Sequence, residues 1–118
     1  MTITSMRDVS FVIPVYNEEK NLRVLYGELI AAGDTLRRSY EIVFVDDGST
    51  DGSFPALREI QAGDPRVKII RLRRNFGQTA ALTAGFDHAR GGIIITLDAD
   101  LQNDPADAPL LVAKIDEG

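Results

Sequence analysis

The chain has 118 residues, of which 44% are apolar, and a formal net charge of −5. This length suits one domain with a hydrophobic core, and the acidic balance argues against a nucleic-acid partner, because proteins that bind the phosphate backbone are usually basic. The sequence contains no cysteine, which excludes disulfides and thiolate metal sites, and no apolar run reaches the roughly 20 residues that span a bilayer.

The first part of the chain predicts a strand, a helix and a second strand. Residues 9–15 form an apolar strand, and Asn17 is the expected N-cap of the helix, because its side chain can accept a backbone N–H. Gly33 is the expected end of this helix. The apolar residues of the helix recur at helical spacing and define one buried face: Leu22, Leu25, Tyr26, Leu29 and Ile30. The second strand, residues 40–45, runs into an acidic turn over residues 46–52.

A short helix and a third strand follow this turn. Pro55 is compatible with the first turn of the helix, since a first-turn N–H has no helical partner. The residues expected to face inward are Phe54, Leu57 and Ile60. The strand covers residues 67–72 and is expected to place Val67, Ile69 and Arg71 on one face, because side chains alternate along a strand.

The last part of the chain begins with a basic loop over residues 73–78. A helix over residues 79–89 is then expected to bury Leu82, Phe86 and Ala89. Residues 93–97 are apolar and mostly β-branched, which predicts a strand buried on both faces. Asp104 and Pro105 match the cap and first position of a final helix, whose apolar residues are Leu110, Leu111 and Ile115.

Strands and helices therefore alternate along the whole chain. Because crossovers between parallel strands are right-handed, this pattern predicts a parallel α/β sheet with helices on both faces, in three layers. The expected strand order is third, second, first, fourth. Ligands of such sheets bind beyond the carboxyl ends of the strands, and the unusual polar clusters of the sequence all fall at that edge.

Asp98 and Asp100 are the strongest candidates for chemistry. They follow the fourth strand with one residue between them, so in an extended backbone their carboxylates point the same way. Two such close charges repel one another unless a cation lies between them or one is protonated. Oxygen ligands without cysteine favour a hard cation, Mg²⁺ or Mn²⁺. The alternative interpretation is a pair of acidic residues in a solvated loop.

Other candidates remain open when each is taken alone. Asp46 and Asp47 could accept hydrogen bonds from a ribose hydroxyl or a base N–H, or could belong to an acidic turn. Tyr16 could stack on a base or be a surface aromatic residue. The basic side chains Arg71, Arg73 and Arg74 could contact phosphate oxygens or be solvated. His88 is expected to be an exposed structural residue.

The sequence lacks the motifs that are typical of several other classes of protein. The sequence has no G-x-G-x-x-G after the first strand, no P-loop, no cysteine nucleophile and no serine elbow. A nucleotidyltransferase would need a glycine-rich basic loop after the first strand. A receiver-like signalling domain would need acidic residues there and a lysine late in the sheet. A phosphate-binding site that lacks these loops but contains a metal ion held by carboxylates favours a sugar nucleotide as the ligand.

Three segments, residues 12–19, 45–52 and 97–102, resemble the N-terminal half of glycosyltransferase family 2 enzymes with the GT-A fold. The segments at residues 74–78 and 100–105 are similar to the branch that transfers a sugar to polyprenyl phosphate, as dolichyl-phosphate mannose synthases and bacterial undecaprenyl-phosphate glycosyltransferases do. The resemblance extends over nearly the whole chain, and the motifs occur in the family's order.

The resemblance also implies roles for individual residues. It assigns Asp98 and Asp100 to the catalytic metal, with Asp100 the firmer ligand, and it places Gln102 beside the metal and the donor phosphates. The remaining residues that the resemblance assigns to donor binding are Pro14, Tyr16, Glu18, Asp46, Asp47, Ser49, Asn75, Gly77, Gln78 and Ala99.

The implied activity is metal-dependent glycosyl transfer with inversion, from a UDP- or GDP-linked sugar to an acceptor, expected to be polyprenyl phosphate at the cytoplasmic face of a membrane. A phosphate acceptor is already anionic, so it has less need of a strong general base than a sugar hydroxyl has. Residues 1–118 are expected to be a single donor-binding domain that ends before the acceptor-side region. The alternatives are a nucleotide-sugar-binding module without turnover and a transferase that acts on a polysaccharide hydroxyl.

Overall fold

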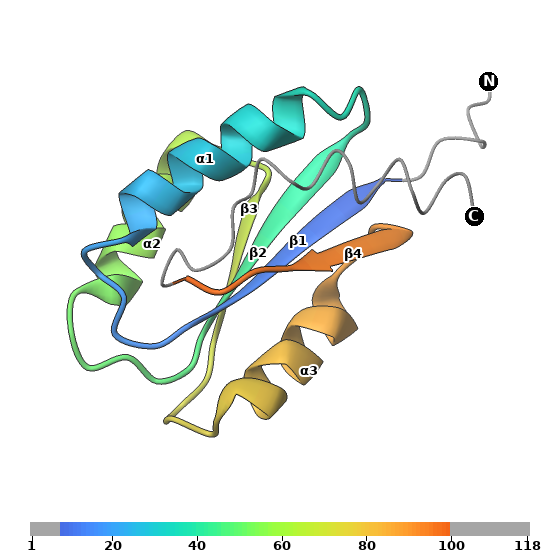
Figure 1. Cartoon of the computed structure of the whole chain (residues 1–118). Coiled ribbons are helices and arrows are strands. Elements are labelled where there is room, and N and C mark those ends of the chain that lie inside the picture. Colours follow the sequence, from blue (N-terminus) through green and yellow to red (C-terminus); the bar gives the residue numbers. More distant parts are fainter. Residues whose placement is uncertain (1–7, 100–118) are drawn as a thin grey trace.

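A computed structural model of the chain describes residues 8–99 (Figure 1). Strands and helices alternate as the sequence predicts: β1 (Val9–Val15), α1 (Leu22–Asp34), β2 (Tyr40–Asp46), α2 (Ser53–Gly63), β3 (Val67–Arg71), α3 (Gln78–His88) and β4 (Ile93–Thr96). The final helix expected from Asp104 onward lies outside the described residues. Over residues 8–99, none of the helices has the length and apolar content needed to cross a membrane.

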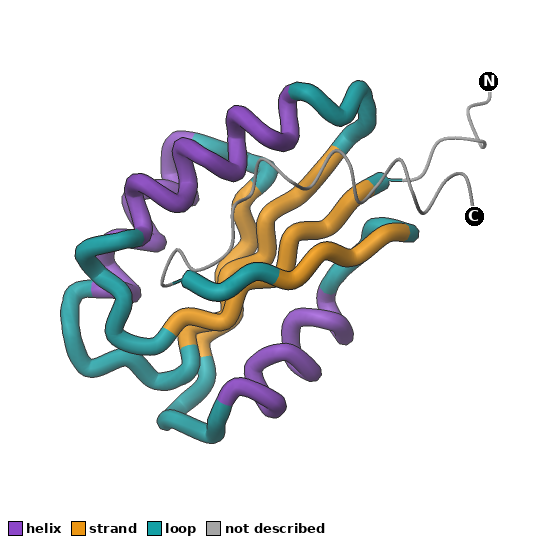
Figure 2. The backbone as a smooth tube through the Cα atoms, viewed as in Figure 1, coloured by secondary structure: helices purple, strands orange, loops and turns teal. Residues whose placement is uncertain are grey.

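The four strands form one parallel sheet in the order β3-β2-β1-β4, which confirms the predicted topology (Figure 2). β1 lies in the interior of the sheet, paired with β2 on one side and with β4 on the other. The chain therefore turns to opposite sides of β1 after its first and third crossovers. This reversal opens a space beyond the carboxyl end of β1, where ligands of such sheets bind.

Helices cover both faces of the sheet, as predicted. α1 and α2 lie on one face and α3 lies on the other (Figure 1). Side chains of β1 alternate between these layers: Phe11 and Ile13 belong to the larger core, and Val12 belongs to a smaller one that contains Ala81 of α3. The described residues thus have the three-layer α/β/α architecture that alternating elements dictate.

α1 begins later than the sequence indicates. Its N-cap is Asn21, not Asn17, and the Asn21 side chain donates a hydrogen bond to the Glu18 carboxylate (2.8 Å). Asn17 has a φ of 52° and lies in the loop before the helix. The prediction was wrong because Asn17 makes contacts with a distant loop instead of with the helix. Gly33 lies one residue inside the helix end, where it packs against the Tyr40 ring.

α3 presents a different face to the sheet from the one predicted. Ala81 and Gly85 are buried against the strands, whereas Phe86 is 45% exposed and Leu82 and Ala89 are only partly buried. A Cβ atom at Gly85 would lie 2.4 Å from Val12 Cγ1, so the helix approaches the sheet too closely for a larger residue there. Small residues on α3 permit the helix to approach the sheet this closely. The sequence prediction was based on large apolar residues, so it could not detect this packing.

Other expected burials are also only partial, including those of Tyr26 and Ile30 in α1. Phe54 of α2 is half-buried, and the Arg71 guanidinium lies 4.0 Å from its ring centroid. In β4, Ile93 and Ile95 are buried but Ile94 is 40% exposed, so this strand is not covered on both faces as predicted. Ile94 is exposed because β4 is the end strand of the described sheet, and only one face of this strand is well covered.

The close packing of α3 yields a first prediction. Gly85→Ala should lower the free energy of unfolding by about 1 kcal/mol, because overpacking against the buried Val12 outweighs the gain in helix propensity. Gly27 of α1 is the matched control: a Cβ there meets nothing within 4 Å, so Gly27→Ala should stabilise the protein by about 0.5–1 kcal/mol. Urea unfolding of both variants measures this difference. Equal shifts of the same sign would contradict the packing argument.

A buried carboxylate ties α1, α2 and β3 together at the edge of the sheet remote from the strands' carboxyl ends. Asp64 is 4% exposed and accepts hydrogen bonds from Arg66 Nε (3.0 Å) and from the Tyr26 hydroxyl (2.6 Å). The hydrogen bonds from the Arg66 side chain lower the pKa of Asp64 to about 2. The Tyr40 hydroxyl also accepts a hydrogen bond from Arg66 Nη1 (2.6 Å).

This lowered pKa predicts an acid sensitivity. A carboxyl whose pKa is depressed in the folded state contributes stability above its unfolded pKa of about 4 and loses it as the pH falls towards the folded value. We expect the free energy of unfolding to fall between pH 4 and 2, and Asp64→Asn to remove on the order of 2 kcal/mol at pH 7 while flattening that pH dependence. Urea unfolding at pH 7, 4 and 3 measures both. An unchanged slope in the variant would assign the acid sensitivity to other groups.

Candidate functional site

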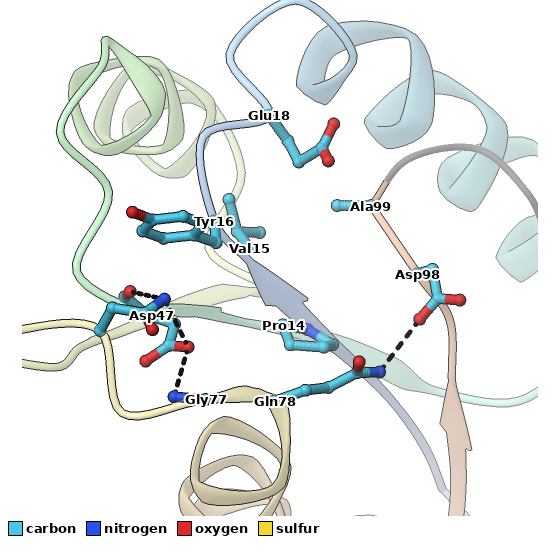
Figure 3. A pocket seen from close by; sticks show the side chains of 10 residues that line it. Pro14, Val15, Tyr16, Glu18, Asp47, Gly77, Gln78, Asp98 and Ala99 are labelled. Atoms are coloured by element: carbon cyan, nitrogen blue, oxygen red, sulfur yellow. Dashed lines mark hydrogen bonds between the residues drawn. The ribbon is translucent and has the colours of Figure 1, made fainter.

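A cavity of about 410 Å³ lies beyond the carboxyl ends of β1, β2 and β4, at the reversal of strand order (Figure 3). It is walled by the ends of these strands and by the loop that leads into α3. The lining residues are Pro14, Val15, Tyr16, Glu18, Asp47, Asn75, Gly77, Gln78, Asp98 and Ala99. Segments far apart in the sequence thus meet at one edge because parallel strands all end there.

Nearly all the candidate donor-binding residues in the described part of the chain line this cavity. The exceptions are Asp46 and Ser49, which the structure places outside the lining. Val15 lines the cavity although the sequence singled it out only as a strand residue. Its place between Pro14 and Tyr16 was the available signal. Asp100 and Gln102 lie outside the described residues.

The Asp47 carboxylate binds the loop before α3. It is 4% exposed and accepts hydrogen bonds from the backbone N–H groups of Phe76 (2.8 Å) and Gly77 (3.0 Å). Its Oδ2 also accepts a hydrogen bond from Asn75 Nδ2 (3.2 Å). A carboxylate offers about four acceptor positions, so these contacts leave about one for a ligand. Asp47 therefore both lines the cavity and holds its wall in place.

Asp46 has a different environment from its neighbour. Its side chain is fully buried, and Oδ1 accepts a hydrogen bond from the backbone N–H of Ser49 (3.1 Å). Oδ2 has no hydrogen-bond partner among the described residues, and Arg71 Nε lies 4.0 Å from it. In this structure the Asp46 carboxylate shapes the turn, and Asp46 is not among the residues that line the cavity.

Asp98 lies across the cavity from Asp47 (Figure 3). Its Oδ1 accepts a hydrogen bond from Gln78 Nε2 at the start of α3 (3.3 Å). Within residues 8–99, no three His, Cys, Asp or Glu side chains gather closely enough to hold a metal ion. The oxygens of Asp98, Glu18 and Gln78 are nevertheless the type of donor that a hard cation prefers. Oxygen donors of this kind would suit Mg²⁺ or Mn²⁺ better than a softer metal.

The described lining of the cavity carries negative charge. Within residues 8–99, three carboxylates line it, those of Glu18, Asp47 and Asp98, and no lysine or arginine does. The basic side chains Arg71, Arg73 and Arg74 do not line it, and Arg74 instead lies over the Phe76 ring, 4.6 Å from its centroid. An anionic ligand would be repelled by this lining unless a cation offset the charge.

Comparison with known proteins gives a consistent picture. Residues 10–118 match the family described as Glycosyl transferase family 2. The chain is 52% identical over 111 residues to an undecaprenyl-phosphate 4-deoxy-4-formamido-L-arabinose transferase of Edwardsiella ictaluri; the match covers 93% of this chain and 34% of that relative. The chain therefore spans about a third of the length of the curated relatives it matches.

Solved structures share the fold. A mannosyltransferase from Pyrobaculum calidifontis in complex with GDP-Man and Mn²⁺ aligns with a TM-score of 0.78 and 27% identity, over 94% of this chain and 32% of that one. TarS 1-349 from S. aureus in complex with UDP-GlcNAc aligns with a TM-score of 0.76 and 26% identity, over 93% of this chain and 31% of that one. Both are larger proteins in which the matching part is about a third of the chain.

Proposed function

The chain belongs to glycosyl transferase family 2, and from this membership we propose that it is the nucleotide-sugar-binding part of a glycosyltransferase. Its parallel sheet with helices on both faces is the fold of GT-A glycosyltransferases. The observation that carries the proposal is the carboxylate-lined cavity at the reversal of strand order, built from the residues that the family resemblance assigns to the donor.

The proposed donor is a UDP- or GDP-linked sugar. Tyr16 would stack on the base, and the remaining acceptor position of Asp47 would take a hydrogen bond from the nucleoside. Asp98, with Asp100, would hold Mg²⁺ or Mn²⁺; the mannosyltransferase of similar fold was solved with Mn²⁺. When bound, this metal neutralises charge on the departing diphosphate. Gln78 would orient the Asp98 carboxylate through its hydrogen bond (3.3 Å).

The proposed acceptor is a polyprenyl phosphate, because the curated relatives are named as undecaprenyl-phosphate transferases. Its anionic oxygen would attack the anomeric carbon directly, with inversion, and would require no strong general base. We place the reaction at the cytoplasmic face of a membrane. The acceptor-binding residues are proposed to lie in sequence that corresponds to the part of the relatives that this chain does not match.

Isothermal calorimetry with UDP, GDP and their sugar conjugates, each with and without Mn²⁺, tests the proposal. We expect one nucleotide class to bind, and Mn²⁺ to tighten its binding. If no nucleotide binds to the folded protein in the presence of Mn²⁺, the donor-site assignment fails. A transfer assay with labelled donor and polyprenyl phosphate then separates an active transferase from a binding module without turnover. The same assay with a polysaccharide acceptor tests the remaining alternative.

A further inference from the structure

Asn17 joins two loops at the carboxyl edge of the sheet. Its φ of 52° is in the left-handed region, and it lies in the loop between β1 and α1. Its Oδ1 accepts hydrogen bonds from the backbone N–H groups of Thr50 (2.8 Å) and Asp51 (3.2 Å), in the loop between β2 and α2. Its own backbone N–H donates to Ser49 Oγ (2.9 Å). One residue thus makes both donor and acceptor contacts with a loop more than thirty positions away.

The residues after Asn17 extend this contact. The backbone N–H of Glu18 donates to Ser53 Oγ (2.9 Å), and the Glu19 carboxylate accepts a hydrogen bond from the backbone N–H of Gly52 (2.9 Å). We call the hydrogen-bonded pair of segments, residues 17–19 and 49–53, the loop clasp. Asn17 provides the central acceptor of the loop clasp, because its single Oδ1 serves two consecutive backbone N–H groups.

The residue type suits this position for two separate reasons. Asparagine tolerates a positive φ better than most residues, and its amide oxygen can accept more than one hydrogen bond without adding a charge. Its neighbours Tyr16 and Glu18 both line the cavity, although Tyr16 is 46% exposed (Figure 3). The backbone of residue 17 determines the directions in which these two neighbours leave the chain, so restraining it restrains them.

We propose that Asn17 is a positioning residue of the donor site: through the loop clasp it holds Tyr16 and Glu18 facing the cavity. The expected effect of Asn17 on nucleotide affinity rests on the proposed function. The geometric content of the inference, the restraint of Tyr16, does not depend on the identity of the ligand. Neither the helical pattern nor the family resemblance assigned Asn17 this role.

Three variants separate the contributions of Asn17. Asn17→Gly accepts the positive φ but removes the side-chain oxygen, so it deletes the central acceptor of the loop clasp without straining the backbone. Asn17→Asp retains both the φ tolerance and an acceptor oxygen, and serves as the conservative rescue. Thr50→Ala is the matched control, because it removes only the long hydrogen bond from the Thr50 hydroxyl to Asn17 Oδ1 (3.5 Å) and leaves the Thr50 N–H in place.

Tyr16→Trp supplies a reporter of the restraint, since the chain has no other tryptophan. In this background, acrylamide quenching should increase with Asn17→Gly and stay near the parent value with Asn17→Asp and Thr50→Ala. In the Tyr16 background, calorimetry should show that Asn17→Gly weakens nucleoside diphosphate binding about tenfold, because the ligand must then order side chains that the loop clasp no longer restrains. Asn17→Asp should restore most of that affinity.

The two measurements distinguish the possible failures. Unchanged quenching in Asn17→Gly would overturn the restraint of Tyr16. Increased quenching with unchanged nucleotide affinity would overturn the positioning role, and so would an increase in quenching that Asn17→Asp shares while both variants remain folded by circular dichroism. If the parent protein binds no nucleotide at all, the proposed function fails, while the quenching series still tests the loop clasp.

Discussion

Asp47→Ala is expected to lower the free energy of unfolding by about 3 kcal/mol and to abolish measurable nucleotide binding. The carboxylate is 4% exposed and accepts hydrogen bonds from Asn75, Phe76 and Gly77. Two of these donors are backbone N–H groups that the alanine variant would leave without their acceptor. Losing charge-assisted hydrogen bonds and the last acceptor position open to a nucleoside should therefore affect stability and binding together.

Urea unfolding and calorimetry with UDP and GDP measure the two effects. Asp87→Ala is the matched control, because Asp87 is an exposed carboxylate near the far end of α3 and its loss should change neither quantity. Asp47→Asn should also weaken nucleotide binding with or without metal. The NH₂ group of the asparagine would replace an acceptor oxygen and would then face N–H groups, to which it cannot hydrogen-bond. A folded Asp47→Ala protein with full stability would mean that the loop before α3 is held by other contacts.

Asp98→Asn is expected to remove the coupling between Mn²⁺ and nucleotide. In the parent protein the metal and the diphosphate should bind cooperatively, because the part of the lining that the structure describes carries three carboxylates and no basic side chain. Each ligand supplies charge that the other lacks, and coupling of this kind is typically about 5–150-fold in affinity. A neutral amide is a weaker ligand for a hard cation than a carboxylate, so the variant should bind Mn²⁺ almost equally with and without nucleotide.

The experiment titrates Mn²⁺ into the parent and into Asp98→Asn, each with and without UDP and GDP. Stability should change little, because asparagine can still accept the hydrogen bond from Gln78 Nε2 (3.3 Å) and Asp98 is only half-buried. Asp87→Asn controls for the loss of one negative charge. Parent affinity for Mn²⁺ that is independent of nucleotide, or full coupling in Asp98→Asn, would contradict a metal-bridged donor. The same titration of Asp100→Ala tests the second predicted ligand.

The strand order and the location of the site could be predicted from the sequence because they follow from short-range periodicity and one topological rule. Apolar runs such as residues 9–15 and 40–45 define the strands, and right-handed crossovers then leave β3-β2-β1-β4 as the expected order. Once the strands are parallel, residues that follow them must share an edge. The sequence alone therefore predicts that one edge of the sheet carries Asp47, Gln78 and Asp98, and all three line the cavity.

Only the tertiary structure decided which of several similar residues occupies a helix cap or contacts the cavity. The sequence predicts Asn17 as the N-cap where the structure has Asn21, and Asp46 and Asp47 both match a site carboxylate. Contacts more than twenty-five positions apart separate them: Asn17 binds Thr50, and Asp47 binds Phe76. Gly85, which sets the approach of α3 to Val12, has no apolar side chain for a pattern to detect. Local sequence determines which elements form, whereas the partner of each polar group depends on segments that only folding brings within hydrogen-bonding distance.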